Sequence, residues 1–362
     1  MGTTLAIFGK GRSNNFNLIR MIAACSVLVS HSYALAPYDG EEPLQGMLGM
    51  SLGGVAVIAF FVLSGFFIAQ SLDRRVSIAD FATARVFRIW PALVIMLFLC
   101  AFVLGPLVTE LPRGEYLSRR GVFGYVIRNT SLFWGRYDLP GVFTANHFPN
   151  VVNGSLWSLA YEVECYAVLA LVIILSPRHS FYKCAAIVAA NAAFLWSTSE
   201  DLLSPHNRVI ISFALGAVGY QLRDHIPLRW DLLGIIAVLA GLTRFTPIWI
   251  PACIIVLGYG VAVLGAVESD LLRSYNKLGD YSYGTYIYAF PLQQCFALLF
   301  PKASPASMIA ATLPAVVLAA WLSWTFVERP CLSYRHAVVS HLRRKLGWMI
   351  PGFLTRLSPS RP

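Results

Sequence analysis

Long apolar segments, separated by short polar connections, recur along the whole chain and restrict its fold more than any other feature. A membrane-spanning helix needs about 20 predominantly apolar residues. We therefore predict an all-α, polytopic integral membrane protein with about ten transmembrane helices. The expected spans are roughly 18–36, 49–71, 89–109, 155–176, 184–198, 208–222, 230–246, 248–267, 282–300 and 306–327.

The composition agrees with this class. Hydrophobic residues make up 57% of the chain and charged residues 13%, whereas a soluble domain usually carries about 25% charged residues. The formal net charge of +10 lies mostly in short loops between apolar segments, so it does not indicate nucleic-acid binding. The cysteines have no metal-ligand or redox spacing, and we expect no metal. We also expect no cleaved signal peptide, because a second apolar segment closely follows the first.

The distribution of charge predicts the orientation in the membrane. Basic residues of short loops favour the cytoplasmic side, and counting alternate sides from an inner N-terminus places most of them there. The first outer loop has Asp39, Glu41 and Glu42 and no basic residue. We therefore predict that both termini are cytoplasmic, with a membrane domain over 1–335. A basic tail over 336–362 is expected to be attracted to anionic lipid headgroups.

The longest connection between predicted spans runs from Pro112 to Ser155. Connections of this length are usually functional or disordered. Its second half, 134–154, is rich in aromatic, Gly, Pro and Asn residues, which favours a structured cap or re-entrant segment over a flexible linker. We expect this half to form part of the functional site.

Arg20 and His31 place two ionisable side chains in the first span. Eleven residues make about three helical turns, or roughly 16 Å of rise, so both side chains lie on one face. Ionisable residues within a membrane are costly and mark functional sites by default. An imidazole can accept a proton near neutral pH, so His31 is a candidate general base for a hydroxyl substrate. The alternative is a histidine that is hydrogen-bonded in the core of a helix bundle.

Arg85 and Arg88 form a second candidate group. Their spacing of three places both guanidiniums on one helix face. Arginine pairs suit phosphate groups, which they hold in bidentate geometry. The alternative is that both arginines anchor the cytoplasmic end of a span, as arginines commonly do.

Glu162 and Glu164 lie in the apolar segment that opens the fourth span. Glu162 shares a helix face with Tyr166, four residues later, whereas Glu164 points elsewhere. Each carboxylate within a membrane must pair or be protonated. Glu162 is therefore expected either to orient His31 or to neutralise a membrane arginine.

Three further clusters have mainly structural interpretations. The Gly- and Phe-rich segment 53–66 would let helix backbones approach closely. The tyrosines of 280–286 fit an interfacial aromatic belt. Glu328, at the inner end of the last span, is expected to be an anchor or to form an ion pair.

As an ordered set, these motifs resemble acyltransferase family 3 of membrane proteins. The resemblance extends from Asn14 to about Pro330. Its motifs are Arg20 and His31 separated by ten residues, FFVLSGF at 60–66, RVFRIWP at 85–91, NGSLWSL at 153–159 leading to Glu162, SYG at 282–284, and ERP at 328–330.

The resemblance implies a ten-helix O-acyltransferase of the bacterial inner membrane. Its donor would be cytoplasmic acetyl-CoA, and its acceptor a surface polysaccharide such as O-antigen or exopolysaccharide. The residues that it marks as functional are Arg20, His31, Arg85, Arg88 and, as a further member, Glu162. The chain departs from the family twice: YAFP at 288–291 lacks the histidine that many relatives carry there, and Val163 separates glutamates that many relatives have as a pair.

The expected mechanism follows from these assignments. Arg85 and Arg88 bind the phosphates of acetyl-CoA, and the pantetheine arm brings the thioester near His31. His31 removes a proton from an acceptor hydroxyl, whose oxygen attacks the acetyl carbonyl; a relay through acetyl-His31 is the variant. Residues expected to be catalytic are His31, Glu162 and Arg20, and those expected to bind the acceptor are Trp157, Tyr166 and Asn153. The partners are acetyl-CoA, a glycan or lipid-linked saccharide, and membrane lipids.

Two other functions stay open at this point. A transporter or flippase of a polar or lipid-linked glycan would also need about ten helices and buried charges, although such proteins often show inverted repeats that this chain lacks. The second open function is that of an acyltransferase-like sensor or scaffold that has no enzymatic activity. The retained ionisable residues of the predicted site count against it.

Overall fold

The computed structural model describes residues 3–9, 14–74, 78–133, 135–176, 179–197, 201, 203–335 and 338. Within these ranges the chain is helical and contains no β-strand, only two isolated bridges. Lys10, Arg12 and Trp134 lie outside the described residues, and so does the predicted basic tail apart from residue 338.

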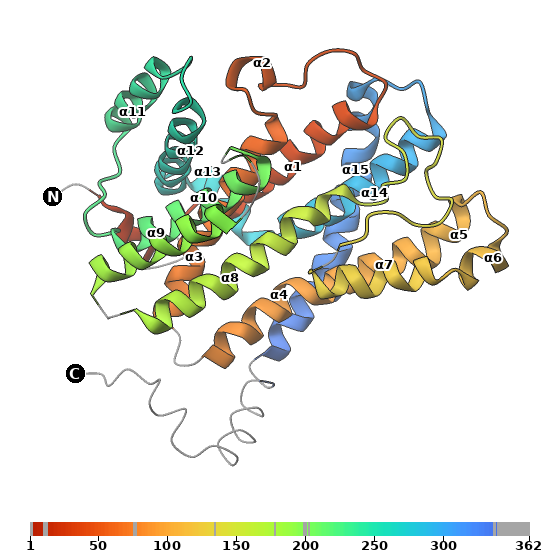
Figure 1. The fold of residues 1–362 in the computed structure, drawn as a ribbon, viewed down its shortest axis with the longest axis horizontal. Coiled ribbons are helices and arrows are strands. Elements are labelled where there is room, and N and C mark those ends of the chain that lie inside the picture. Colours follow the sequence, from red (N-terminus) through yellow and green to blue (C-terminus); the bar gives the residue numbers. More distant parts are fainter. Residues whose placement is uncertain are drawn as a thin grey trace.

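Figure 1 shows the helices arranged as one bundle. In chain order, the elements are η1 (Leu5–Gly9), α1 (Phe16–Leu35), α2 (Gln45–Leu48), α3 (Leu52–Arg74), α4 (Ile78–Phe98), the π-helix η2 (Leu99–Leu104), α5 (Gly105–Val108), α6 (Arg113–Ser118), α7 (Arg120–Ser131), η3 (Gly154–Leu156), α8 (Trp157–Leu175), α9 (Ser180–Ser197), α10 (Pro205–Gln221), α11 (Trp230–Leu242), α12 (Trp249–Ala266), α13 (Asp270–Ser274), η4 (Tyr275–Lys277), α14 (Ser282–Leu299), α15 (Pro305–Ser323) and the π-helix η5 (Trp324–Glu328).

Six helical segments of the described chain are long and apolar enough to cross a membrane. They are Phe16–Leu35, Leu52–Arg74, Ala79–Val108, Gly154–Leu175, Trp249–Ala266 and Pro305–Arg335. The prediction of an all-helical membrane protein is confirmed in this form. Every one of the ten predicted spans overlaps a helix, but the count of ten spans and the cytoplasmic position of both termini stay predictions.

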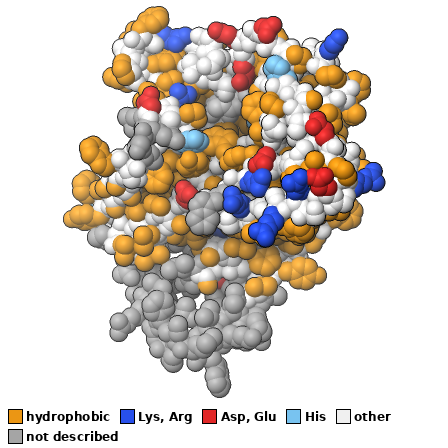
Figure 2. Space-filling model, turned by 45° about the vertical axis from the view of Figure 1, so that its right-hand side comes forward, with side chains coloured by type: hydrophobic (Ala, Val, Ile, Leu, Met, Phe, Trp, Pro, Cys, Tyr) orange, Lys and Arg blue, Asp and Glu red, His pale blue; other side chains and the backbone are white. Residues whose placement is uncertain are grey.

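Large apolar side chains are exposed on the outside of the bundle, as a lipid-facing surface requires. Trp196 is 92% exposed and Leu175 is 74% exposed. Hydrophobic side chains cover much of the face in Figure 2, whereas charged side chains gather in its upper and right-hand parts. Apolar surface on this scale would be an aggregation hazard in water, and a bilayer covers it.

The inner helices approach one another through small residues. α3 packs against both α1 and α10. A Cβ atom on Gly65 of α3 would lie 2.0 Å from the carbonyl oxygen of Phe213, and one on Gly216 of α10 would lie 2.0 Å from that of Val62. The close approach predicted for the Gly- and Phe-rich segment is therefore confirmed.

α14 packs against several other helices of the bundle. It contacts α1, α15 and α4, while α7 lies along α4 and α11 pairs with α12 at the opposite side of the bundle (Figure 1). The first half of the long connection is helical, because it forms α6 and α7. Val122 and Tyr125 of α7 are fully buried, which gives this amphipathic helix a core-facing side.

The second half of that connection has no helix but is held in place by α14. Asn146 Nδ2 donates a hydrogen bond to the side-chain oxygen of Gln294 at 2.6 Å. Gln294 Nε2 in turn donates to the carbonyl oxygens of Phe148 at 2.8 Å and Val151 at 2.6 Å. Residues 135–153 are thus structured and not a flexible linker, as predicted, and their anchor is the buried amide side chain of Gln294.

Candidate active site

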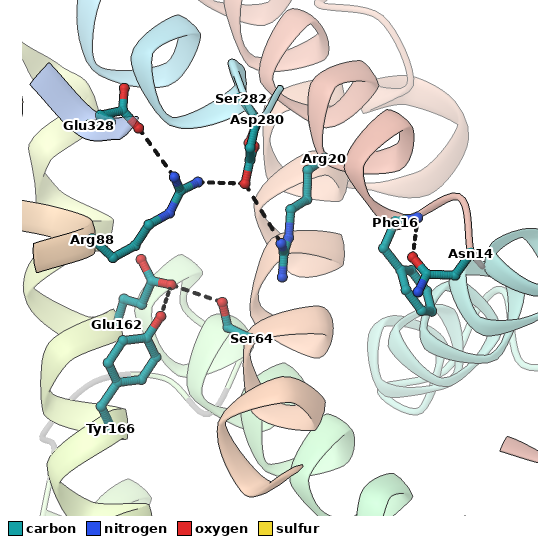
Figure 3. Close-up of polar contacts among 10 residues, drawn as sticks. All are labelled: Asn14, Phe16, Arg20, Ser64, Arg88, Glu162, Tyr166, Asp280, Ser282 and Glu328. Atoms are coloured by element: carbon teal, nitrogen blue, oxygen red, sulfur yellow. Dashed lines mark hydrogen bonds and ion pairs between the residues drawn. The ribbon is translucent and has the colours of Figure 1, made fainter. Parts of the chain in front are cut away.

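Two carboxylates hold the guanidinium of Arg88 on α4 (Figure 3). Its Nη2 lies 2.6 Å from Oδ2 of Asp280, and its Nη1 lies 3.2 Å from Oε2 of Glu328. Nη1 of Arg20 on α1 lies 4.0 Å from the same Asp280 oxygen. This network ties α1 and α4 to the segment before α14 and to η5. The ion pair predicted for Glu328 is therefore confirmed.

Asp280 is charged at this position. Burial by itself would raise the pKa of its carboxyl group, but the guanidiniums of Arg88 and Arg20 outweigh burial and hold that pKa below its usual value. The hydroxyl of Ser282 also donates a hydrogen bond to this carboxylate at 2.6 Å. Arg88 therefore has its charge compensated within the protein.

Arg85 differs from Arg88, although both line the same cavity. The buried Nε of Arg85 has no hydrogen-bond partner among the described residues. Buried polar groups are nearly always satisfied, and leaving one unpaired costs about 1–3 kcal/mol. Arg85 is therefore the guanidinium that is left available for an anionic ligand.

Glu162 on α8 accepts hydrogen bonds from the hydroxyls of Ser64, at 2.8 Å, and Tyr166 (Figure 3). The face that Glu162 and Tyr166 were predicted to share is therefore confirmed. Glu164 instead lines an apolar groove between α8, α9 and α10. Of the two roles predicted for Glu162, this geometry favours balancing the membrane arginines over orienting His31.

These side chains surround a cavity of about 130 Å³, called here the arginine cavity. The polar side chains that line it are Arg20, Ser64, Arg85, Arg88, Ser158, Glu162, Tyr166, Ser282, Tyr283 and Tyr286. Sites for drug-sized molecules usually measure about 300–1,000 Å³. The arginine cavity therefore has room for a narrow part of a ligand rather than for a whole nucleotide cofactor.

His31 lies on a second cavity of about 440 Å³, called here the histidine cavity, at the other end of α1. The Nδ1 atom of His31 is buried and has no hydrogen-bond partner among the described residues. Its ring packs edge-on against Phe290, with ring centroids 5.0 Å apart. The described structure therefore gives no support to the alternative of a histidine hydrogen-bonded in the core.

Glu42 lines the histidine cavity together with His31. Its carboxylate accepts a hydrogen bond from the hydroxyl of Ser30, the residue before His31. Burial raises the pKa of Glu42, against the opposing effect of this hydrogen bond. Trp157 and Arg208 also line this cavity. An aromatic side chain beside hydrogen-bonding groups can bind a sugar, which has both apolar ring faces and hydroxyl groups.

One face of α14 joins the two cavities. Tyr283, Tyr286 and Phe290 have the i, i+3, i+7 spacing of a single helix face. The Tyr283 ring lies beside Arg88, whose Cζ is 5.7 Å from the ring centroid, and Phe290 packs on His31. Tyr286 lies between them and lines both cavities. The aromatic face thus runs from the arginines to the imidazole.

The segment before α8 holds this face in place. Asn153 is fully buried, and its Nδ2 donates to the carbonyl oxygen of Ile287 at 2.9 Å while its Oδ1 accepts from the backbone of Ser155. A Cβ atom on Gly154 would lie 2.7 Å from the Phe290 ring. Because its amide is already occupied by the protein, Asn153 positions the start of α8.

The predicted site residues therefore fall into three groups. Arg20, Arg85, Arg88, Glu162 and Tyr166 line the arginine cavity; His31 and Trp157 line the histidine cavity; Asn153 lines neither. The expected mechanism, in which the pantetheine arm brings the thioester near His31, requires one shared passage. The described residues instead place the arginines and His31 on different cavities, whose linings share Val57 and Tyr286.

Sequence reasoning missed several members of the site. Asp280 was left without a role, and Ser64 was placed in a packing motif. The interpretation of the tyrosines of 280–286 as an interfacial belt is wrong for Tyr283 and Tyr286, which line the arginine cavity. The spacing of Tyr283, Tyr286 and Phe290 was the available signal for a common face.

No group of three or more His, Cys, Asp or Glu side chains that could hold a metal ion occurs among the described residues. The chemical groups of the site are therefore guanidiniums, carboxylates, hydroxyls and one imidazole. Such a set can bind an anion at one end and move a proton at the other.

Comparison with known proteins places this arrangement in a family. The model of an acyltransferase domain matches residues 13–328. An O-acetyl transferase of Shigella phage Sf6 is 29% identical over 338 residues, which cover 89% of this chain and 97% of that protein. Nodulation protein 10 of Rhizobium leguminosarum bv. viciae is 26% identical, covering 91% and 96%. Acyltransferase MdmB of Streptomyces mycarofaciens is 23% identical, covering 87% and 90%. No solved structure matches significantly.

Proposed function

Since this chain belongs to acyltransferase family 3 and is a membrane-bound O-acyltransferase, we propose that it transfers an acetyl group from acetyl-CoA to a saccharide hydroxyl. The acceptor is a surface polysaccharide or a lipid-linked oligosaccharide. The donor enters from the cytoplasm at the arginine cavity, and the acceptor binds at the histidine cavity on the outer side of the bacterial inner membrane.

The donor end of the proposal rests on Arg85. Its buried Nε lacks a partner, whereas Arg88 is already held by Asp280 and Glu328. A phosphate of acetyl-CoA, or the thioester carbonyl, supplies the missing acceptor. Arg20 lines the same cavity and adds a second guanidinium. Because the cavity is narrow, the adenine nucleotide stays at its mouth and only the pantetheine arm enters.

The acceptor end rests on His31. Its imidazole lies on a cavity large enough for a sugar unit, beside Glu42 and Trp157. His31 removes the hydroxyl proton while the sugar oxygen forms a bond to the acetyl carbonyl carbon. The carbon–sulfur bond then breaks, and the CoA thiolate takes up a proton as it leaves. A relay through acetyl-His31 uses the same groups in two steps.

Glu162 is assigned to the donor end, where its carboxylate positions the arginines that line the arginine cavity. Its hydrogen bonds with Ser64 and Tyr166 fix the carboxylate in the wall of that cavity. Three arginines line the cavity, and the carboxylates of Glu162, Asp280 and Glu328 balance their charge. This balance lets buried guanidiniums remain charged in a membrane.

The observation that carries the proposal is the single face of α14, which connects an arginine-lined cavity with His31. The test uses membranes that contain this protein and acetyl-CoA labelled in the acetyl group. Label is expected in the glycan or lipid-linked saccharide fraction, and surface glycans from cells with and without this gene should differ in their O-acetyl NMR signals. Equal O-acetyl signals at a verified protein level would contradict the proposal. The transporter alternative predicts such equality, and no observation favours it.

A further inference from the structure

We infer that Tyr286, with Val57, is the partition that keeps water of the histidine cavity away from the thioester until an acceptor hydroxyl is in place. This inference rests on the proposed function. It assigns Tyr286 a positioning role that neither the sequence motifs nor the comparisons point to. Its consequence is a specific one: the partition decides between transfer to sugar and loss of the acetyl group to water.

The partition is seen in the walls of the two cavities. Tyr286 and Val57 are the two residues that both linings share, and Tyr286 is only 9% exposed. The Tyr286 ring also packs edge-on near Phe60, with ring centroids 6.0 Å apart. Phe60 lines the arginine cavity. Side chains from α3 and α14 therefore lie between the two cavities.

The hydroxyl of Tyr286 is fixed at the start of α8. It donates to the carbonyl oxygen of Ser155 at 3.0 Å and hydrogen-bonds with Ser158 Oγ at 2.6 Å. Ser158 itself lines the arginine cavity. A ring held at both its face and its hydroxyl keeps one orientation. The partition is therefore a built feature of the site and not a side chain that happens to fill space.

The chemistry explains why a partition is needed. In transfer, a sugar oxygen bonds to the acetyl carbon and the carbon–sulfur bond breaks, releasing CoA as its thiol. Water can replace the sugar in the same step and yields acetate and CoA thiol. The histidine cavity has polar side chains in its wall, and it is many times larger than the roughly 10–15 Å³ that one water requires. Closing a site against water is a known means of preventing such side reactions.

The experiment measures two products of the purified full-length protein in lipid nanodiscs. Acetyl-CoA is supplied alone and then with saccharide acceptor, and CoA thiol and acetylated saccharide are quantified separately. For Tyr286→Ala we expect CoA release without acceptor to rise several-fold, and transfer to fall. Tyr286→Phe keeps the ring but loses both hydrogen bonds of the hydroxyl, so its CoA release without acceptor should lie between those of the wild type and Tyr286→Ala.

Two further variants separate the partition from damage to the fold. Val57→Ala is a small change in the other shared residue and should raise CoA release in the same direction. Tyr288→Ala removes a tyrosine from the same helix that lines neither cavity, and should leave the ratio of CoA release to transfer unchanged. A purely structural role for Tyr286 would lower both products together.

The outcomes also separate this inference from the proposed function. If the wild type transfers acetyl but neither Tyr286→Ala nor Val57→Ala raises acceptor-independent CoA release, the partition is overturned and the proposed function stands. If the wild type neither releases CoA nor acetylates any saccharide, the proposed function fails, and the inference fails with it.

Discussion

The guanidinium of Arg88 lies 3.2 Å from the carboxylate of Glu328, a residue 240 positions further along the chain. Glu328 is 1% exposed and Arg88 is 23% exposed, so a fully buried carboxylate meets a partly buried guanidinium between α4 and η5. Asp280 holds the other side of the same guanidinium. One arginine therefore joins three segments that are remote in sequence, and its removal should be felt in the stability of the whole bundle.

Arg88→Ala is expected to destabilise the protein strongly. The change leaves Asp280 and Glu328 as buried carboxylates without their main partner, a situation that typically costs about 3–5 kcal/mol. The measurement is thermal unfolding in detergent micelles, with Arg229→Ala as the control. Arg229 and its partner Asp231 are both more than half exposed, so solvent screens that ion pair and its loss should leave the unfolding temperature nearly unchanged. Equal unfolding temperatures for the Arg88 variant and the wild type would contradict the network.

Arg85→Ala is expected to weaken donor binding while leaving the fold intact. The buried Nε of Arg85 has no hydrogen-bond partner among the described residues, so the substitution should cost the protein little internal hydrogen bonding. A hydrogen bond between charged groups contributes about 1.5–3 kcal/mol, which corresponds to roughly a tenfold to hundredfold rise in the donor Kd. Isothermal titration with acetyl-CoA measures this change.

The matched control for Arg85 is Arg128→Ala, which changes an exposed arginine of α7. Donor affinity of that variant should equal that of the wild type. If the Arg85 variant binds acetyl-CoA with unaltered affinity, the phosphate site must lie elsewhere in the protein.

His31→Ala is expected to lower acetyl transfer by about 10²–10⁴-fold, the usual contribution of a general acid or base. Folding should persist, because the imidazole has no hydrogen bond to lose among the described residues. Transfer is measured at equal protein levels in membranes. His225→Ala, an exposed histidine in the connection after α10, serves as the control. Normal transfer by the His31 variant would reject its role as base.

Glu162→Gln and Glu164→Gln test two carboxylates of α8 that are separated by one residue. The Glu162 variant keeps the shape of the side chain but loses a charge beside three arginines and weakens the hydrogen bonds with Ser64 and Tyr166. We expect at least a tenfold fall in transfer, corresponding to the roughly 1.5 kcal/mol of one charged hydrogen bond. Glu164 lines the apolar groove, so its variant should retain transfer. Equal losses in both variants would contradict the assignment.

The sequence by itself determined the class of the protein and most of its helices. Apolar segments of membrane length overlap helices throughout the chain, because a helix in lipid must be apolar over its whole length whatever it packs against. The pairing of Glu162 with Tyr166 was also predictable, since residues four apart on a helix always share a face. The helices α6 and α7 were missed because they are amphipathic and lie in a connection that lacks a membrane-length apolar segment.

Only the tertiary structure decided which charged side chains form ion pairs and which predicted site residues line which cavity. Asp280 reaches Arg20 and Arg88 across more than half the chain, and Tyr286 lines both the arginine cavity and the histidine cavity, where the expected mechanism requires one shared passage. A membrane helix is apolar on every side, so its sequence has little periodic signal to show which face meets a cavity and which meets lipid. That choice depends on helix packing, which brings together side chains whose separation in sequence carries no information about their distance in space.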